Sequence, residues 1–175
     1  MAKDYSSLRN FIRDIPDWPI KGVLFRDITP LLKDADAFAD AVDALCDGIN
    51  VDDIDVVAGV EARGFIFGAA VARKLGVGFV PIRKAGKLPW QTESISYQLE
   101  YGTAKIEVHA DAMKNGSRVL MIDDLLATGG TMAAACELIK KAGGEIADIV
   151  FLVELIDLKG RDKLLQYPLT SIIKL

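Results

Sequence analysis

The apolar residues of the chain fall into two patterns that alternate along most of its length. Short runs rich in valine, isoleucine and leucine predict buried strands at residues 55–60, 78–83, 118–124 and 147–155. Residues 64–75 and 131–142 instead carry apolar side chains at helical spacing, and each segment is followed by glycine. Strands and helices that alternate in this way imply right-handed crossovers. We therefore expect an α/β fold, a doubly wound, mainly parallel sheet flanked by helices, with residues 170–175 as a further strand.

The N-terminal part of the chain has a weaker pattern. A short helix ending before Pro16 is predicted by apolar residues at helical spacing, namely Leu8, Phe11, Ile12 and Ile15. Residues 17–34 contain prolines and a glycine and are expected to be irregular. Asp34 is a suitable N-cap for a second helix, whose apolar positions are Phe38, Ala41, Val42, Leu45 and Ile49.

One polar segment interrupts the alternation of strands and helices. Residues 84–104 are too polar for a core element and too long for an ordinary connection. Loops of this length are commonly lids over a ligand. The segment has two interpretations, a lid that closes over a site and a hairpin arm that serves an interface, and we favour the lid.

Composition narrows the class of protein. Of the 175 residues 51% are hydrophobic, which is enough for a sizeable core, so we expect one domain over residues 1–175. The formal net charge of −4 weighs against a protein held on nucleic acid by phosphate neutralisation. The chain has no apolar signal segment at its N-terminus and no run near the ~18 apolar residues of a membrane span, so we expect a soluble, cytoplasmic protein. A single histidine excludes metal sites that need several imidazoles, and Cys46 and Cys136 are expected to be buried thiols.

The strongest chemical signal lies in residues 119–131, VLMIDDLLATGGT. An apolar strand ends in Asp123 and Asp124, and a turn of small residues, 127–131, opens the next helix. Ligands of an open parallel sheet bind beyond the carboxyl ends of its strands, where the amides of such a turn and the helix dipole attract phosphate. Carboxylates accept hydrogen bonds from hydroxyls. The aspartates therefore suit the vicinal hydroxyls of a ribose 5-phosphate, provided that the strand ends at the pair so that both can reach one ligand.

The alternatives to a sugar-phosphate site are weaker. A strand that ends in solvated acids before an ordinary helix cap would explain a bare Asp-Asp pair, but not the pair joined to the ATGGT turn in this order. A P-loop is excluded because no Gly-Lys-Ser/Thr follows, and a dinucleotide site because the chain lacks the GxGxxG fingerprint.

Residues 119–131 resemble the signature with which type I phosphoribosyltransferases bind phosphoribosyl pyrophosphate (PRPP). The resemblance implies that Asp123 and Asp124 hold the ribose hydroxyls. It also implies a Mg²⁺ cofactor that is held on PRPP rather than by the protein alone, with Asp123 the carboxylate that could reach it. The 5-phosphate would be bound by Ala127, Thr128, Gly129, Gly130 and Thr131.

Other segments resemble the members of this family that act on adenine, and the similarity runs over nearly the whole chain. They are residues 22–34, 59–68, 82–89, 96–102 and 153–161. The resemblance implies purine salvage, in which adenine and PRPP give AMP and pyrophosphate. Residues 1–33 would then form a small base-binding hood, in which Phe25 stacks on the purine. The adenine pocket would consist of Leu24, Phe25, Arg26 and Leu155.

The same resemblance implies the residues for pyrophosphate and for catalysis. Residues 84–104 would be a flexible catalytic loop, in which Glu100 manages the proton that the purine loses, and Arg63 would be the second catalytic residue. The resemblance gives His109 no role, so we expect it to be structural, and Trp90 has no role that we can assign. Pyrophosphate would be bound by Glu61, Ala62, Arg63, Arg83, Lys84, Lys87 and Tyr101.

Two other functions stay open on the sequence alone. A PRPP-sensing regulator without catalysis is disfavoured by the acidic charge and by the lack of residues for a nucleic-acid module. A phosphoribosyltransferase for hypoxanthine, guanine or xanthine is disfavoured only by resemblance, which Leu24 in place of the family's usual valine does little to weaken. The resemblance further implies a homodimer whose partners are the small molecules adenine and PRPP, without nucleic acid or membrane.

Overall fold

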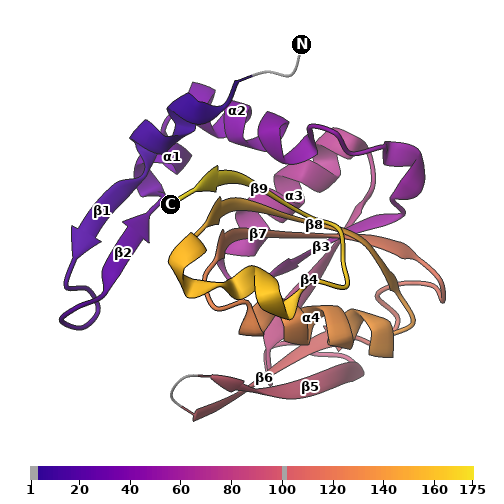
Figure 1. The fold of residues 1–175 in the computed structure, drawn as a ribbon. Coiled ribbons are helices and arrows are strands. Elements are labelled where there is room, and N and C mark those ends of the chain that lie inside the picture. The colour runs from indigo at the N-terminus through magenta and orange to yellow at the C-terminus, as the bar shows by residue number, and fades with distance from the viewer. Residues whose placement is uncertain (1–3, 100–101) are drawn as a thin grey trace. The chain divides into compact units, whose positions relative to one another are not determined.

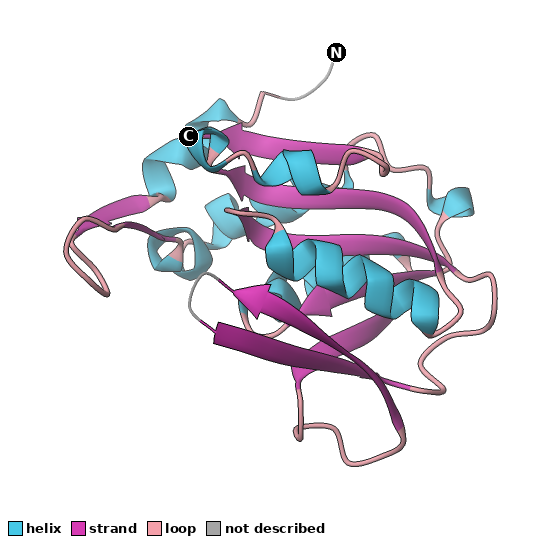
Figure 2. Ribbon diagram, turned by 60° about the horizontal axis from the view of Figure 1, so that its bottom comes forward, coloured by secondary structure: helices cyan, strands magenta, loops and turns pink. Residues whose placement is uncertain are grey.

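The computed structural model describes residues 4–99 and 102–175, and the chain divides into two compact units, residues up to 47 and residues 48–175. Figure 1 labels their helices and strands, and Figure 2 shows the same elements by type. The expectation of one domain over the whole chain stays a prediction. No helix among the described residues is long and apolar enough to cross a membrane.

The first unit consists of a strand hairpin and three helical elements. The hairpin pairs β1 (Arg13–Pro16) with β2 (Leu24–Asp27) in antiparallel register. The helical elements are the 3-10 helix η1 (Ser6–Phe11), α1 (Thr29–Lys33) and α2 (Ala35–Cys46). Asp34 caps α2 as predicted, because its Oδ1 accepts a hydrogen bond from the Ala37 N–H at 2.9 Å.

Two expectations for this unit are corrected by the structure. The helix predicted from Leu8 to Ile15 ends at Phe11, and Ile15 lies in β1 opposite Phe25. Residues 17–34, expected to be irregular, contain β2 and α1. At Ile15 the hairpin supplies extended backbone with a cross-strand partner, which overrides the local helical spacing.

The second unit is built on a seven-stranded sheet with the order β5-β6-β4-β3-β7-β8-β9. Five of the strands are parallel, as predicted, and they are β3 (Val56–Val60), β4 (Gly78–Lys84), β7 (Arg118–Leu126), β8 (Glu145–Glu154) and β9 (Leu169–Lys174). The antiparallel strands β5 (Thr92–Leu99) and β6 (Gly102–His109) complete one edge. The helical elements are η2 (Val51–Asp53), α3 (Arg63–Leu75), α4 (Gly130–Lys141), η3 (Ile156–Leu158) and η4 (Gly160–Lys163).

The central strands are buried on both faces, as their apolar composition predicts. Val119 and Met121 of β7 belong to the core that α4 covers, whereas Leu120 and Ile122 alternate with them and are fully buried on the opposite face. Cys136 is buried in α4, and this burial raises the pKa of its thiol to about 12. The prediction of a buried thiol is confirmed for Cys136, while Cys46 is only half-buried.

The polar segment 84–104 forms most of a hairpin rather than an irregular loop. β5 and β6 pair in antiparallel register, and β6 joins β4 at the sheet edge. Ile95 and Tyr97 pack against the core, whereas Ser96 and Gln98, which alternate with them, are exposed. The alternation that is typical of a half-buried strand is short in β5, because Glu93 lies on the same strand face as Ile95 and Tyr97. Closure of this hairpin over a ligand stays a prediction.

Candidate active site

A cavity of about 390 Å³ opens at the carboxyl ends of β3 and β7. Open parallel sheets bind their ligands at this edge. The cavity brings together the two aspartates, the turn 127–131 and the segment that follows β3, all of which the sequence predicted as parts of one site. Its lining consists of residues 60–63, residues 123–132 and Phe151.

Asp123 and Asp124 lie inside β7, so the prediction that the strand ends at the pair is wrong. β7 continues past them because it still pairs with β8, but its pairing with β3 stops at Ile122. One edge of β7 is therefore open from Asp123 onward. A Cβ added to Gly64 would lie 2.9 Å from Asp123 Oδ1, and Arg63 forms an ion pair with Asp124. Both carboxylates thus reach the start of α3 from adjacent positions.

The surroundings of the two carboxylates disfavour their negative charge. Burial and the neighbouring charge of Asp124 raise the pKa of Asp123 well above its ordinary value. Burial also raises the pKa of Asp124, although Arg63, whose Nε lies 2.8 Å from Asp124 Oδ2, favours the ionised form. Apart from this ion pair, the buried Asp124 Oδ2 has no hydrogen-bond partner among the described residues. A ligand that brings hydroxyl donors or a cation would therefore stabilise the ionised form of the two carboxylates.

The acidic pair fits a Mg²⁺ ion that a phosphate ligand carries in. Within residues 4–99 and 102–175 no group of three or more histidine, cysteine, aspartate or glutamate side chains could hold a metal. Mg²⁺ commonly binds through one or two carboxylates together with the phosphates of a substrate. Asp123 and Asp124 offer that number of carboxylates at the cavity wall.

The turn 127–131 carries unpaired backbone amides at the cavity wall. None of its five N–H groups donates a hydrogen bond to a described residue. Gly129 has a φ of 75°, in the left-handed region, and is the N-cap of α4. Buried amides without partners are rare in proteins, but at a helix N-terminus they form an anion site. The turn therefore forms a cradle of amide donors that suits an anion such as a phosphate group.

Residues 159–163 brace this turn, a role that sequence reasoning missed. A Cβ on Gly129 would lie 2.2 Å from Gly160 O, and a Cβ on Gly160 would lie 2.2 Å from Ala127 O. The next residue, Arg161, binds the buried carboxylate of Glu154 at 2.7 and 3.0 Å, and so holds η4 against the end of β8. A glutamate that ends an apolar strand and an arginine seven residues later are the sequence signal that could have indicated this brace.

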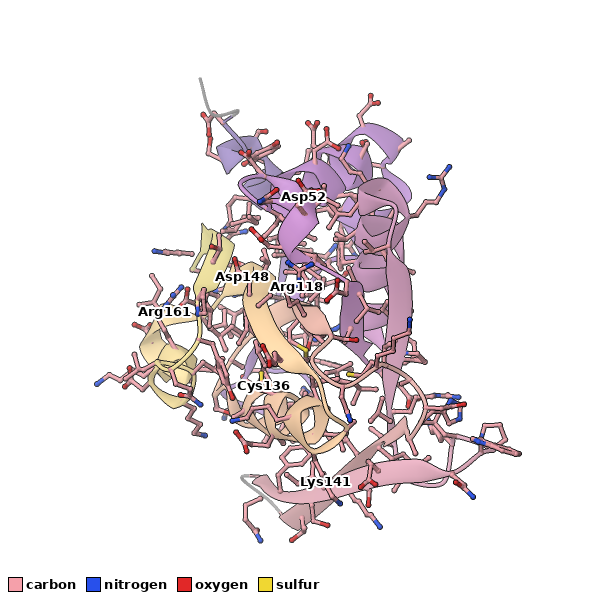
Figure 3. All side chains as sticks on the ribbon, turned by 90° about the vertical axis from the view of Figure 1, so that its right-hand side faces the viewer. Asp52, Arg118, Cys136, Lys141, Asp148 and Arg161 are labelled. Carbon is pink, nitrogen blue, oxygen red and sulfur yellow. The ribbon has the colours of Figure 1, made fainter. Side chains whose placement is uncertain are left out.

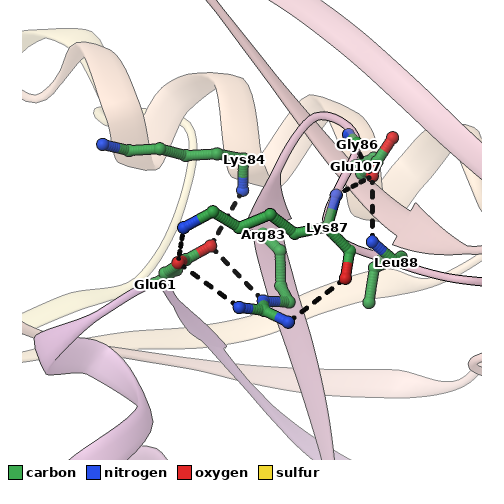
Figure 4. Close-up of polar contacts among 7 residues, drawn as sticks. All are labelled: Glu61, Arg83, Lys84, Gly86, Lys87, Leu88 and Glu107. Atoms are coloured by element: carbon green, nitrogen blue, oxygen red, sulfur yellow. Dashed lines mark hydrogen bonds and ion pairs between the residues drawn. The ribbon is translucent and has the colours of Figure 1, made fainter.

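The Glu61 carboxylate contacts three basic residues beside the cavity, as Figure 4 shows. Its carboxylate lies 2.5 Å from Lys87 Nζ and 3.4 Å from Arg83 Nε, and it accepts the backbone N–H of Lys84 at 3.1 Å. These contacts, the one with Lys87 above all, lower the pKa of Glu61 to about 2. Arg83 and Lys87 therefore face Glu61 and do not line the cavity. Their predicted binding to pyrophosphate stays a prediction, as does that of Lys84.

Glu107 holds the turn that carries Lys87. This buried carboxylate accepts the backbone N–H groups of Gly86, Lys87 and Leu88 at 2.8, 3.2 and 3.3 Å. Lys87 is thus fixed through its main chain by Glu107 and through its side chain by Glu61. No role for Glu107 was predicted from the sequence, because its hydrogen bonds reach a turn some twenty residues away.

The predicted base-binding residues are divided between the two units. In the first unit, Leu24, Phe25 and Arg26 lie in β2, where the Phe25 ring makes an edge contact with Trp18 at a centroid distance of 4.4 Å. Arg26 forms an ion pair with Asp14 of β1. In the second unit, Leu155 directly follows β8. The Trp18 contact was not foreseen from the sequence.

The remaining predicted residues have mixed outcomes. Glu100 and Tyr101 lie outside the described residues. His109 ends β6, and its buried Nε2 has no hydrogen-bond partner among the described residues. Trp90 lies between β4 and β5 and is 66% exposed.

Comparisons with known proteins agree with this geometry. Residues 31–173 match the model of the phosphoribosyl transferase domain. The chain is 53% identical to the adenine phosphoribosyltransferase of Pseudothermotoga lettingae over 166 residues, which cover 95% of this chain and 98% of that one. It superposes on the crystal structure of adenine phosphoribosyltransferase from Thermoanaerobacter pseudethanolicus with a TM-score of 0.92 and 49% identity, covering 98% of this chain and 99% of that one.

A more distant enzyme was solved with ligands. The adenine phosphoribosyltransferase of Saccharomyces cerevisiae, complexed with D-2,5-dideoxy-2,5-imino-altritol 1,6-bisphosphate and adenine, matches with a TM-score of 0.90 and 37% identity, covering 98% of this chain and 99% of that one. Family model, sequence identity and fold thus agree over nearly the whole chain. The chain belongs to the adenine phosphoribosyltransferases of the phosphoribosyltransferase family.

Proposed function

We propose that this protein transfers ribose 5-phosphate from PRPP to adenine, giving AMP and pyrophosphate. The observation that carries the proposal is the cavity in which an acidic pair, Asp123 and Asp124, adjoins five unpaired amides at the start of a helix. A sugar phosphate needs both, because its phosphate oxygens accept hydrogen bonds and its hydroxyls donate them. The relatives named above support adenine as the base.

The turn 127–131 binds the 5-phosphate in this proposal. Its amides and the α4 dipole favour the negative charge, and the hydroxyls of Thr128 and Thr131, which line the same cavity, add two donors. Asp123 and Asp124 accept hydrogen bonds from the ribose hydroxyls. Such bonds to a charged acceptor contribute about 1.5–3 kcal/mol each, and they also relieve the repulsion between the two acids.

The departing pyrophosphate lies beside residues 61–63 in this proposal. The bond from the anomeric carbon to pyrophosphate breaks as a purine nitrogen attacks, so negative charge grows on the leaving group while the ribose ring becomes oxocarbenium-like. The Arg63 guanidinium and the local backbone stabilise that charge. When bound to PRPP, Mg²⁺ supplies further charge neutralisation at the pyrophosphate oxygens.

The pairing of Arg83 and Lys87 with Glu61 limits how readily these two cations can bind pyrophosphate. Both cations already pair with the same carboxylate, that of Glu61. A pyrophosphate that recruits them has to compete with Glu61. Lys84, whose ammonium makes no ion pair within the described part of the chain, is the basic residue of this group that is ready to bind.

The base and the lid complete the proposed mechanism. Leu24, Phe25 and Arg26 of the first unit and Leu155 of the second are the proposed base-binding residues. Glu100 is the proposed acid–base residue for the proton that the purine loses as the glycosidic bond forms. Residues 84–104 are the proposed lid. A lid is needed because water that reaches the anomeric carbon would hydrolyse PRPP.

A base panel tests the function. Pyrophosphate release from PRPP and Mg²⁺ is measured with adenine, hypoxanthine, guanine and xanthine in turn. We expect adenine to support release and the three 6-oxo purines to be slower on the order of 10⁴-fold, because a site built for an exocyclic donor leaves polar groups unpaired when it meets a carbonyl. Equal rates with all bases, or no release with any, would contradict the proposal.

Mg²⁺ dependence, a homodimer and a cytoplasmic location complete the proposal, and each has its own measurement. Chelation with EDTA should abolish turnover, and added Mg²⁺ should restore it. Sedimentation equilibrium should give twice the chain mass of 19.0 kDa. Cell fractionation should place the activity in the cytosol.

A further inference from the structure

The hairpin strand β5 lies along α4 and is fixed to it at two points. At one end Lys141 Nζ forms an ion pair with Glu93 at 2.9 Å and donates to the carbonyl of Ser94 at 3.2 Å. Figure 3 labels Lys141 at this end of α4, next to the hairpin. At the other end the hydroxyl of Tyr97 lies 3.4 Å from Thr131 Oγ1.

The spacing of the two contacts follows from the geometry of strand and helix. Glu93 and Tyr97 are four residues apart on one face of β5, a span of about 13 Å. Thr131 and Lys141 are ten residues apart in α4, a span of about 15 Å. Ile95, between the two contacts on the same strand face, packs against the core beneath α4. The hairpin therefore places Tyr97 at the helix end that forms the phosphate cradle.

The Tyr97 hydroxyl adjoins the cradle without entering it. Thr131 lines the cavity, whereas Tyr97 does not. A Cβ on the neighbouring Gly130 would lie 3.9 Å from the carbonyl oxygen of Gln98, so the end of β5 lies next to the turn. Tyr97 is half-buried and packs against the core cluster, which restricts where its hydroxyl can point.

Hydrogen-bond chemistry gives this contact a direction once a phosphate is present. A phosphate dianion only accepts hydrogen bonds, so Thr131 must use its single proton as donor to the ligand. Thr131 Oγ1 can then only accept from Tyr97, and the tyrosine proton has to point at it. The resulting chain, Tyr97 to Thr131 to phosphate, is cooperative because each bond polarises the next. The observed 3.4 Å is longer than an ordinary bond between hydroxyls and leaves room to shorten when the ligand binds.

We propose that Tyr97 is a positioning residue for the 5-phosphate. Its hydroxyl holds the Thr131 hydroxyl in the orientation that donates to the ligand, and it thereby couples the β5–β6 hairpin to occupancy of the cradle. This inference rests on the proposed function, since it takes the ligand of the turn 127–131 to be a sugar phosphate. The base and the leaving group play no part in it.

Tyr97→Phe tests the inference by removing one oxygen atom. AMP and adenosine, which differ only in the phosphate, are titrated into wild type and variant by calorimetry. The loss of a hydrogen bond of ordinary strength should weaken AMP binding about 3- to 10-fold and leave adenosine binding unchanged. In steady-state assays KM for PRPP should rise, with kcat and KM for adenine nearly constant, because the phosphate is bound equally in ground state and transition state.

Two further variants separate positioning from general damage. Tyr167→Phe is the matched control, because the Tyr167 hydroxyl also contacts α4, at Glu137 Oε1 3.3 Å away, and Tyr167 packs against the same core. It should bind AMP as wild type does. On a Thr131→Val background, which lacks the intermediate hydroxyl, Tyr97→Phe should cause no additional loss, whereas on a Thr131→Ser background its effect should persist.

The outcomes distinguish failure of this inference from failure of the proposed function. If wild type binds AMP or ribose 5-phosphate but Tyr97→Phe binds AMP equally well, or loses adenosine in the same proportion, the positioning role of Tyr97 is overturned and the proposed function stands. If wild type binds neither AMP nor ribose 5-phosphate, the proposed function fails and the inference fails with it. Additive losses in the Tyr97→Phe/Thr131→Val double variant would also overturn the role.

Discussion

Two adjacent acids at the cavity wall, Asp123 half-buried and Asp124 buried, destabilise the protein when no ligand is bound. Asp123 and Asp124 each have a raised pKa because burial disfavours their charge. Ligand hydroxyls and a cation would reverse that penalty, so the same pair that weakens the free protein strengthens substrate binding. A trade of stability for function is common at such sites.

Replacing Asp123 with asparagine should expose this trade. The raised pKa means that the folded protein keeps the proton that the unfolded chain loses near pH 4. Ionisation therefore costs stability progressively as pH rises above that value, and the cost is absent below it. Asp123→Asn should be more stable than wild type by about 0.5–2 kcal/mol at pH 7–8 and equal to it near pH 4, while KM for PRPP rises. Thermal melting between pH 4 and pH 8 measures the difference.

Asp148→Asn is the control for this variant. Asp148 of β8, labelled in Figure 3, also has a pKa raised by burial, and its Oδ1 also accepts the N–H of the next residue, at 2.7 Å. It does not line the cavity. This variant should gain stability in the same pH range without any change in PRPP use. If Asp123→Asn has a lower melting temperature than wild type at pH 8, the destabilisation assigned to the acidic pair is wrong.

Glu61 should show the opposite pH dependence. Its pKa of about 2 in the folded protein lies below the ordinary value of 4.5. The ion pairs with Lys87 and Arg83 therefore stabilise the protein above about pH 4.5, and this contribution is lost as pH falls toward 2. Glu61→Gln should unfold at lower urea concentration than wild type at pH 7, and the gap should shrink at pH 3. A gap independent of pH would show that packing, not charge, explains the effect of the variant.

At the scale of elements, the strands that carry a continuous apolar run could be predicted and the edge hairpin could not. Apolar runs identified β3, β4, β7, β8 and β9, although β9 is half-exposed at the edge of the sheet. The β5–β6 hairpin was missed because Glu93 shares the inward face of β5 with Ile95 and Tyr97 and shortens the apolar pattern. β7 was predicted two residues too short. Its pairing with β3 ends just before the two aspartates, but its pairing with β8 continues past them, so the strand itself does not end there.

The short helix η4 should act on the phosphate cradle through Gly160. Alanine at this position would place its Cβ 2.2 Å from Ala127 O and 2.9 Å from Gly129 N, so the turn 127–131 has to move. Gly160→Ala should lose about 1–3 kcal/mol of stability, as overpacking usually does, and raise KM for PRPP at least tenfold. Urea denaturation and steady-state kinetics measure the two effects.

Gly78→Ala provides the comparison for the glycine variant. A Cβ at Gly78 meets no atom closer than 3.7 Å, and its φ is not in the left-handed region. This variant should keep the wild-type KM for PRPP. If Gly160→Ala shows the same KM as Gly78→Ala, η4 does not shape the cradle.

At the scale of the molecule, the second unit carries the whole cradle, and the sequence predicted it because its parts are local. Asp123, Asp124 and the turn 127–131 lie within nine residues of one another. The cluster of Glu61, Arg83 and Lys87 joins residues 22 and 26 positions apart, so its charge compensation could not be predicted from composition or spacing. Local motifs therefore identified most of the residues that line the cavity, whereas the charge compensation beside it required the three-dimensional structure.

In the proposed function, the amides of residues 127–131 hold the phosphate of a ribose 5-phosphate. This is tested by the amide chemical shifts of the ¹⁵N-labelled full chain during titration with ribose 5-phosphate, with ribose as the control. We expect the amides of residues 127–131 to show the largest shifts with ribose 5-phosphate and to stay in place with ribose. Saturable binding of ribose 5-phosphate that leaves these five amides unmoved would contradict the claim.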